Sequence, residues 1–184
     1  SVPVRVVEEG NVHIGDNAIL NSVDVIEMED AKVRLGNSSE WRIDGDADGI
    51  MQNCDISGNG NVHIETGGKF DLIGMNATLP TSDTSIYVNS PDGEVTIYPQ
   101  GNFDAPVRLT GGNLTIECEC HPNATSPDSY TWIRELYVGC GNLHVYGTLN
   151  VTQHFSVEIC GDLITHPQTP MGEMPCVDAT GATE

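Results

Sequence analysis

Apolar and polar residues alternate along most of this chain in short runs. Examples are Val12 with Ile14, Val33 with Leu35, and Val62 with Ile64, each pair separated by one polar residue. Such alternation over a few residues indicates half-buried β-strands. Glycine, asparagine, aspartate and proline fill the gaps between the runs, as they do in turns. No stretch repeats apolar residues at helical spacing over several turns, so we expect an all-β protein.

Sequence repeats suggest how these strands are arranged. A phrase of glycine, asparagine and an alternating strand begins at Gly10, Gly60, Gly112 and Gly141. The closest echo sets Cys140-Gly-Asn-Leu against Cys160-Gly-Asp-Leu, 20 residues further on. Three short strands fit that interval, which predicts a β-solenoid whose coils bury their inward side chains against one another. At about 20 residues per coil, the chain would form about nine coils.

This pattern resembles right-handed parallel β-helix proteins, most clearly from Leu136 to Ile164. The resemblance implies a single parallel β-helix or β-solenoid domain with short strands and Gly/Asn-containing turns. The earlier repeats are spaced irregularly, however. A disulfide-linked β-sandwich with Greek-key connections therefore stays open as the alternative.

We expect three parts along the chain. Residues 1–9 form an extended strand with Val2, Val4 and Val6 on one face. By default this is the first strand of the domain; alternatively, it is donated to the open sheet edge of a neighbouring subunit. Residues 10–164 form the β-domain. Residues 165–184, rich in Pro, Thr and Gly, form a C-terminal segment that we expect Cys176 to hold in place through a disulfide.

The charge balance excludes some partners. The chain has 27 acidic and 7 basic residues and a formal net charge of −20. Nucleic-acid binding needs clusters of Lys and Arg, so we expect no nucleic-acid partner. No apolar run approaches the roughly 20 residues of a membrane helix, so we expect no membrane insertion.

Cysteines and sequons point to an oxidising compartment. An even number of cysteines suits disulfides, and the absence of a C-x2-C pair makes zinc the weaker interpretation. If the 20-residue coil is right, Cys140 pairs with Cys160. N-x-[ST] sequons predict N-linked glycans. We therefore expect an extracellular or cell-surface protein, with Ser1 following a cleavage site. The cysteines are Cys54, Cys118, Cys120, Cys140, Cys160 and Cys176; the sequons are at Asn37, Asn76, Asn113, Asn123 and Asn150.

One loop has the spacing of a metal site. Asp44, Asp46 and Asp48 occupy alternate positions before Gly49, and this loop resembles EF-hand-type calcium loops. Alternate carboxylates in a tight turn can converge on one Ca²⁺ ion. Asp55 stands where an EF-hand loop has a bidentate glutamate. We expect Ca²⁺ as the cofactor of these four residues; the alternative is a solvated acidic turn.

Two residue types invite other functions. His13, His63 and His144 take the same place in the repeated phrase and point away from its apolar face. We interpret them as polar strand positions rather than a metal-binding ridge. Trp41 and Trp132 offer rings for sugar stacking, but we expect both to be buried anchors.

No catalytic motif accompanies these features. The chain lacks a G-x-S-x-G elbow, an H-E-x-x-H pair and a phosphate-binding glycine loop. We therefore expect a glycosylated structural protein rather than an enzyme, acting as the subunit of a self-assembling filament, surface coat or adhesin. The alternative is a calcium-dependent carbohydrate-binding or polysaccharide-active β-module.

Overall fold

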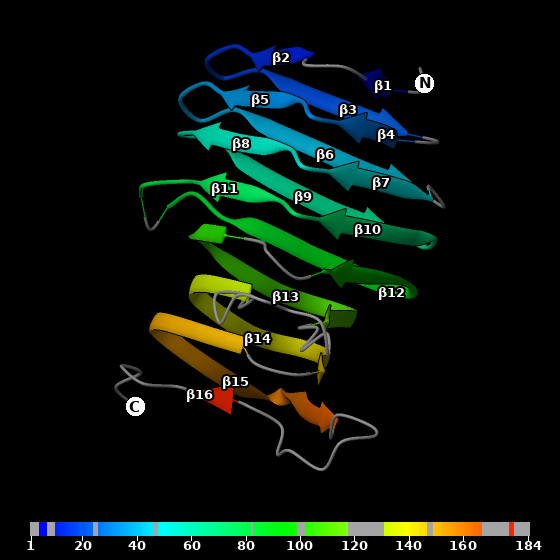
Figure 1. Ribbon diagram of the computed structural model, residues 1–184, viewed down its shortest axis with the longest axis vertical. Helices are drawn as coiled ribbons and strands as arrows, with labels where there is room; N and C mark the ends of the chain where they lie inside the picture. The colour runs from blue at the N-terminus through cyan, green and yellow to red at the C-terminus, as the bar shows by residue number, and fades with distance from the viewer. Residues whose placement is uncertain are drawn as a thin grey trace, which may run out of the picture.

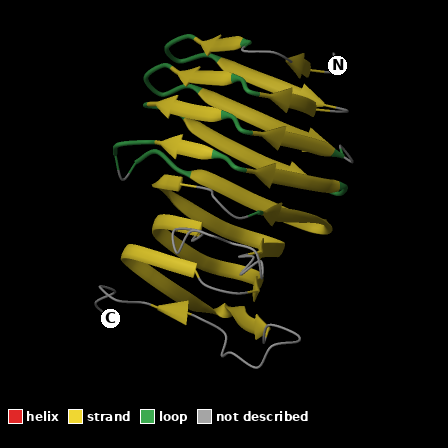
Figure 2. Ribbon diagram, viewed as in Figure 1, coloured by secondary structure: helices red, strands yellow, loops and turns green. Residues whose placement is uncertain are grey.

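A computed structural model describes most of the chain as one stack of parallel strands (Figure 1). None of the described residues is helical (Figure 2). The chain winds into a β-solenoid of about six turns. This confirms the predicted solenoid and rules out the β-sandwich. The described residues are 4–6, 10–23, 26–45, 48–81, 83–98, 102–117, 131–146, 149–166 and 177–178.

The number of coils is lower than the sequence predicts because most coils are longer than 20 residues: the row from Val12 to Val151 takes six coil steps over 139 residues. Cys140 and Cys160 are register partners 20 residues apart. Ile26 pairs with Gly49, however, so that coil takes 23 residues. The turns therefore absorb variable lengths of chain while the strands stay in register.

The strands form three faces, which we name A, B and C. Face A begins with β1 (Val4–Val6), β4 (Ile26–Glu29), β7 (Gly49–Gln52) and β10 (Lys69–Ile73). Face B begins with β2 (Asn11–Ile14), β5 (Lys32–Leu35), β8 (Asp55–Gly58) and β11 (Asn76–Thr78). Face C begins with β3 (Ile19–Val23), β6 (Glu40–Gly45) and β9 (Asn61–Thr66).

Later strands are longer and bend around the corners, so that each contributes to two or three faces. For example, residues 102–104 of one long strand pair on face B, 107–109 on face C and 113–116 on face A. A short final strand adds to face B at the end of the stack. These strands are β12 (Ile86–Ile97), β13 (Asn102–Glu117), β14 (Thr131–Tyr146), β15 (Leu149–His166) and β16 (Val177–Asp178).

The core is built from inward rows that run along the stack. Because side chains alternate across a strand, every second residue of a strand enters the core and its neighbours face outward. Val33 and Leu35 are buried, which places Lys32 and Arg34 outside on face B. One inward row of face B consists of Val12, Val33, Ile56, Ala77, Phe103, Ile133 and Val151.

The repeated glycine phrase does not mark one structural repeat. The copy at Gly10 precedes face B, and the copy at Gly60 precedes face C. Only Gly112 and Gly141 occupy the same corner, before face A, and both have positive φ angles, 78° and 110°. At these two positions a side chain would be strained, which explains the glycines there.

The C-terminal end of the stack is partly open. Val138 and Leu143 in β14 are completely buried, whereas their register partners in β15, Val157 and Leu163, are 40% and 37% exposed. These apolar side chains belong to inward rows. The last described coil of faces A and C therefore presents core residues to its surroundings.

The N-terminal strand pairs within its own chain. Val4 to Val6 form β1, parallel to β4 and in register with Ile26 to Met28. This is the arrangement of an ordinary first strand, and Val2 lies outside the described residues.

Among the described residues, the chain also forms no helix with the length and hydrophobicity that a membrane span requires.

Candidate functional site

The outer surface of face B carries a shallow groove of about 350 Å³. Its strands β5, β8 and β11 lie side by side (Figure 1), and alternation turns their polar residues outward. We call this surface the face B groove, lined by Lys32, Arg34, Asp55, Ile56, Ser57, Asn76 and Thr78.

Two parallel outward rows build the groove. Lys32, Asp55 and Asn76 are successive register partners in the first row. Within this row, Nδ2 of Asn76 donates a hydrogen bond of 3.1 Å to Oδ1 of Asp55. The second row consists of Arg34, Ser57 and Thr78.

The first row continues beyond the groove to an exposed aromatic ring. Asn76 pairs with Asn102, and Asn102 pairs with Trp132. Trp132 is 39% exposed, so the expectation of a buried anchor is wrong for this residue. Trp41, by contrast, is completely buried as expected.

Face C carries several rings that contact one another. His63 stacks on Tyr87 with ring centroids 4.6 Å apart, and the guanidinium carbon of Arg108 lies 4.0 Å from the centroid of Tyr137. A hydrogen bond from Tyr137 to Glu135 raises the pKa of Tyr137, and its partial burial adds to this rise. Because these rings stack on one another, their main effect is to stabilise neighbouring coils.

The three histidines of the repeated phrase do not meet. His13 lies in β2 on face B, His63 in β9 on face C, and His144 in the face A part of β14. This agrees with their interpretation as polar strand positions. The close histidine pair on face A is instead His144 with His166, whose Nδ1 and Nε2 atoms are 3.1 Å apart.

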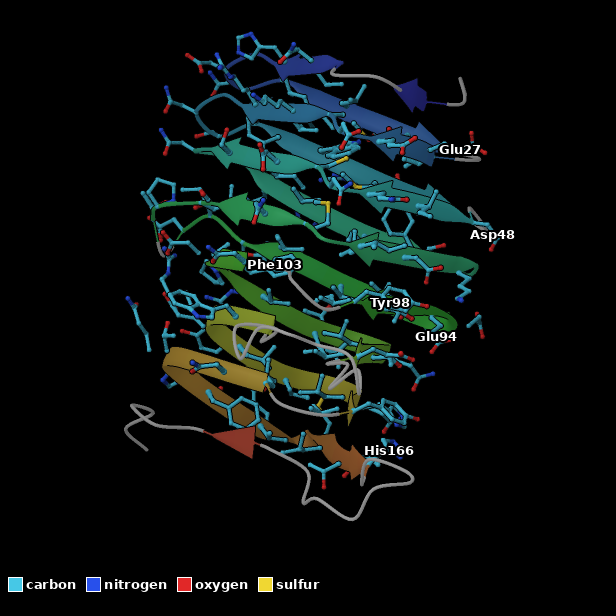
Figure 3. The ribbon with its side chains drawn as sticks, viewed as in Figure 1. Glu27, Asp48, Glu94, Tyr98, Phe103 and His166 are labelled. Carbon is cyan, nitrogen blue, oxygen red and sulfur yellow. A yellow bond between two sulfur atoms is a disulfide. The ribbon has the colours of Figure 1, made fainter. Side chains whose placement is uncertain are left out.

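The predicted calcium loop is only partly described. Asp44 is the second-last residue of β6, and Asp46 lies outside the described residues. Asp48 stands at the edge of the stack in Figure 3, where its Oδ1 accepts a 2.7 Å hydrogen bond from the backbone N–H of Lys69. Asp55 follows the far end of β7, a four-residue strand that spans about 13 Å.

The structure therefore does not bring Asp55 into the loop that holds Asp44 and Asp48. Between Asp48 and Asp55 the chain forms the extended strand β7, where an EF-hand loop wraps around its ion. Among the described residues, no three His, Cys, Asp or Glu side chains are placed to hold a metal ion together. The prediction of a calcium site at Asp44, Asp46 and Asp48 stays untested.

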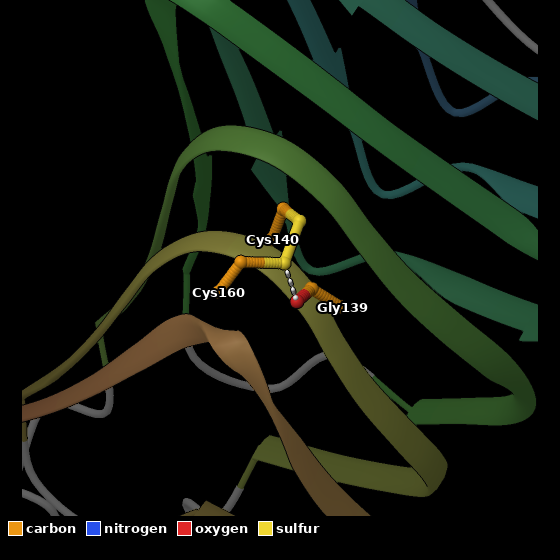
Figure 4. The surroundings of a disulfide bond; sticks show 3 residues. All are labelled: Gly139, Cys140 and Cys160. Carbon is orange, nitrogen blue, oxygen red and sulfur yellow. Dashed lines mark hydrogen bonds between the residues drawn. A yellow bond between two sulfur atoms is a disulfide. The ribbon is translucent and has the colours of Figure 1, made fainter.

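The cysteines divide into paired and free. Cys140 and Cys160 form a disulfide between adjacent coils, as the 20-residue interval predicted (Figure 4). Cys54 is a free, fully buried thiol that donates to the carbonyl oxygen of Gln52, so its assignment to a disulfide is wrong. Its turn position directs the side chain into the core. Cys118, Cys120 and Cys176 lie outside the described residues.

The sequons differ in accessibility. Asn37 is exposed in a turn and uses its Oδ1 to accept from Asn59. Asn76 is exposed, but its Nδ2, the atom that would carry a glycan, donates to Asp55. Asn113 and Asn150 are half-buried, and Asn123 lies outside the described residues. Of the described sequons, Asn37 is the most favourable for modification.

Comparison with models of protein families, with curated proteins and with solved structures finds no match to this chain.

Proposed function

We propose that this protein is a structural subunit of an extracellular filament, surface coat or adhesin, and that its copies associate end to end. The observation that carries this proposal is the incomplete covering of the inward apolar rows at the ends of the stack. Val157 and Leu163 supply the open apolar surface at the C-terminal end.

The N-terminal coil offers a complementary surface. Leu20 is only partly buried, whereas its register partner one coil further in, Trp41, is completely buried. Among the described residues, β2 pairs with β5 alone and β3 with β6 alone. Each therefore has one edge along which no described strand lies, and such an edge is where another strand can add to a sheet.

These two surfaces differ from one another, so contact between them is head to tail. A head-to-tail contact that does not close into a ring produces an open filament. A second copy would continue the parallel ladder and cover the inward rows. Burial of apolar area favours such a contact by about 25 cal/mol per Å².

Other features support an extracellular setting. The Cys140–Cys160 disulfide is typical of proteins that fold in an oxidising compartment. The exposed Asn37 suits N-linked glycosylation, and the large negative charge keeps unassembled copies soluble. The proposal therefore places the protein outside the cell or on its surface, with an N-linked glycan.

Assembly can be tested with a charge at the open C-terminal end. We expect the wild-type chain to form polymers whose mass rises with concentration in analytical ultracentrifugation and which negative-stain electron microscopy shows as filaments. The double variant Val157→Asp/Leu163→Asp should stay monomeric, because it places two carboxylates in the apolar contact.

The matched control is Ile50→Asp. Ile50 is also partly exposed, at 36%, but it faces outward from β7 in the middle of the stack. This variant should polymerise like the wild type. A wild-type chain that stays monomeric at its highest soluble concentration would contradict the proposal, as would unchanged polymers of the double variant.

A further inference from the structure

We propose that the face B groove binds an acidic glycan, whose carboxylates pair with Lys32 and Arg34 and one of whose sugar rings stacks on Trp132. This inference goes beyond end-to-end assembly. The groove runs along the side of the stack, so an occupied groove leaves the terminal coils free.

The first support is the local charge. On face B, the strands from β2 to the face B part of β13 contain Lys32, Arg34, Asp55 and Asp104 as their only Asp, Glu, Lys or Arg residues. The charge of Asp104 is balanced by its ion pair with Arg134. This part of face B thus has an excess of one positive charge in a chain whose net charge is −20. On the neighbouring face C, β3, β6 and β9 carry Glu40, Arg42, Asp44 and Glu65.

The second support is that these two cations are not neutralised by ion pairs. Elsewhere, Arg42 pairs with Glu40, Lys69 with Asp71 at 3.4 Å, and Arg134 with Asp104 at 3.1 Å. Within the described part of the chain, neither Lys32 nor Arg34 forms an ion pair.

The two cations are therefore available to an anionic ligand. The guanidinium of Arg34 can bind a carboxylate through two parallel hydrogen bonds, and the ammonium of Lys32 adds a point charge.

The third support is the polar lining between the cations and the tryptophan. The Asp55–Asn76 pair keeps one carboxylate oxygen and the amide oxygen available as acceptors. Ser57 and Thr78 add hydroxyl groups that both donate and accept. Such groups match the hydroxyls of a sugar, and they are arranged in rows that follow the stack.

The fourth support is Trp132, which stands at the end of the first row. Four coil steps separate it from Lys32, a distance of about 19 Å at the usual strand spacing. An extended oligosaccharide of several units can span this length. The rings on face C are engaged with one another, whereas Trp132 presents more than a third of its surface.

The overall negative charge limits the affinity. Repulsion from distant carboxylates is screened beyond about 8 Å at physiological salt, so the local cations decide the sign of the interaction. Binding should weaken as salt rises. A glycan on Asn76 would occupy the same groove, so the test uses chain made in the periplasm of a bacterium that adds no N-linked glycans.

The test is a titration of the full chain with hexagalacturonate and with its methyl ester, which has the same sugars without the charges. Tryptophan fluorescence reports on Trp132 directly, because Trp41 is buried in the core and contributes a constant background. We expect the methyl ester to bind at least about tenfold more weakly. Lys32→Gln/Arg34→Gln should lose at least as much affinity for the hexagalacturonate.

Two controls match the charge change elsewhere: Arg42→Gln on face C and Lys69→Gln on face A should bind like the wild type. Trp132→Ala, followed by calorimetry, should raise the dissociation constant at least about fivefold. Equal affinity for the acid and its ester would overturn the inference. So would unchanged affinity of Lys32→Gln/Arg34→Gln or of Trp132→Ala, or the absence of binding at millimolar ligand.

Discussion

The indole Nε1–H of Trp41 donates a hydrogen bond of 3.0 Å to Oγ of Ser22, and both side chains are completely buried. Ser22 occupies an inward position of β3 whose register partner is Ile43. A polar residue in an apolar row is explained by this bond, because a buried indole N–H requires an acceptor.

We predict that Ser22→Ala lowers the free energy of unfolding by about 1–3 kcal/mol, since the indole N–H would stay buried without a partner. Urea denaturation followed by circular dichroism measures the change. In a Trp41→Phe background the same substitution should cost much less. An equal cost in both backgrounds would contradict this explanation of Ser22.

Gly49 makes room for the ring of Phe70 in the next coil. A Cβ atom at Gly49 would lie 2.2 Å from Cε2 of Phe70, and the ring is completely buried. We predict that Gly49→Ala destabilises the fold by about 1–3 kcal/mol through overpacking. Replacing Phe70 by Leu in the same chain should recover part of this loss in thermal unfolding. If Gly49→Ala/Phe70→Leu is less stable than Gly49→Ala alone, the steric explanation is wrong.

The disulfide fixes two adjacent coils near the open end. A bond that closes a loop of 20 residues is expected to contribute about 3 kcal/mol through the entropy of the unfolded chain. Cys140→Ser/Cys160→Ser should lose about this much stability. In hydrogen-exchange measurements, the amides of β15 should lose protection before those of β5 or β8. Uniform loss of protection along the stack would contradict a local role.

Cys54 predicts a pH dependence of stability. Burial raises the pKa of its thiol above the usual 9.0, because the thiolate is poorly solvated in the core. The folded state thus favours the protonated form, and this contribution is fully present below pH 9. It is lost as the pH rises through the folded-state pKa.

We therefore expect the wild type to lose more stability than Cys54→Ala between pH 9 and pH 11. Iodoacetamide should modify the folded wild-type chain at this position far more slowly than the unfolded chain. Rapid modification of the folded chain at neutral pH would contradict the burial of Cys54.

The aspartates on the two sides of β7 should differ in their effect on calcium binding. If Asp44, Asp46 and Asp48 bind Ca²⁺, titration calorimetry in calcium-free buffer should record heat that Asp48→Asn abolishes. Asp55→Asn should leave the heat unchanged, because Asp55 lies beyond the strand. Absence of heat with millimolar Ca²⁺ in the wild type would leave the loop as a solvated acidic turn.

The sequence pattern within a single strand was enough to predict much of the local structure. The alternation of Lys32, Val33, Arg34 and Leu35 correctly indicates which side chains are buried. The pairing of Cys140 with Cys160 follows from one local repeat. Long-range register was less accessible, because the glycine phrase recurs at different corners and the turns vary in length.

The groove was missed for the same reason. Trp132 is far from Lys32 and Arg34 in the sequence, and only the register of five coils brings it to the same face. The scarcity of basic residues was a usable signal, since two of the seven lie in one four-residue strand. The residues next to Trp132 in the sequence give no comparable indication that its side chain is exposed.

The spacing of the coils is independent of the length of chain in their turns. Asn113 pairs with Asn142, 29 residues later, yet the ladder from Asn113 to Glu117 continues against β14 without a shift. The ladder thus tolerates a longer coil without a change of register, since each added residue of connecting chain costs little closure entropy. If copies do stack end to end, a peptide added to one coil would recur at regular intervals along the polymer, so the solenoid could carry a foreign sequence as a periodic array.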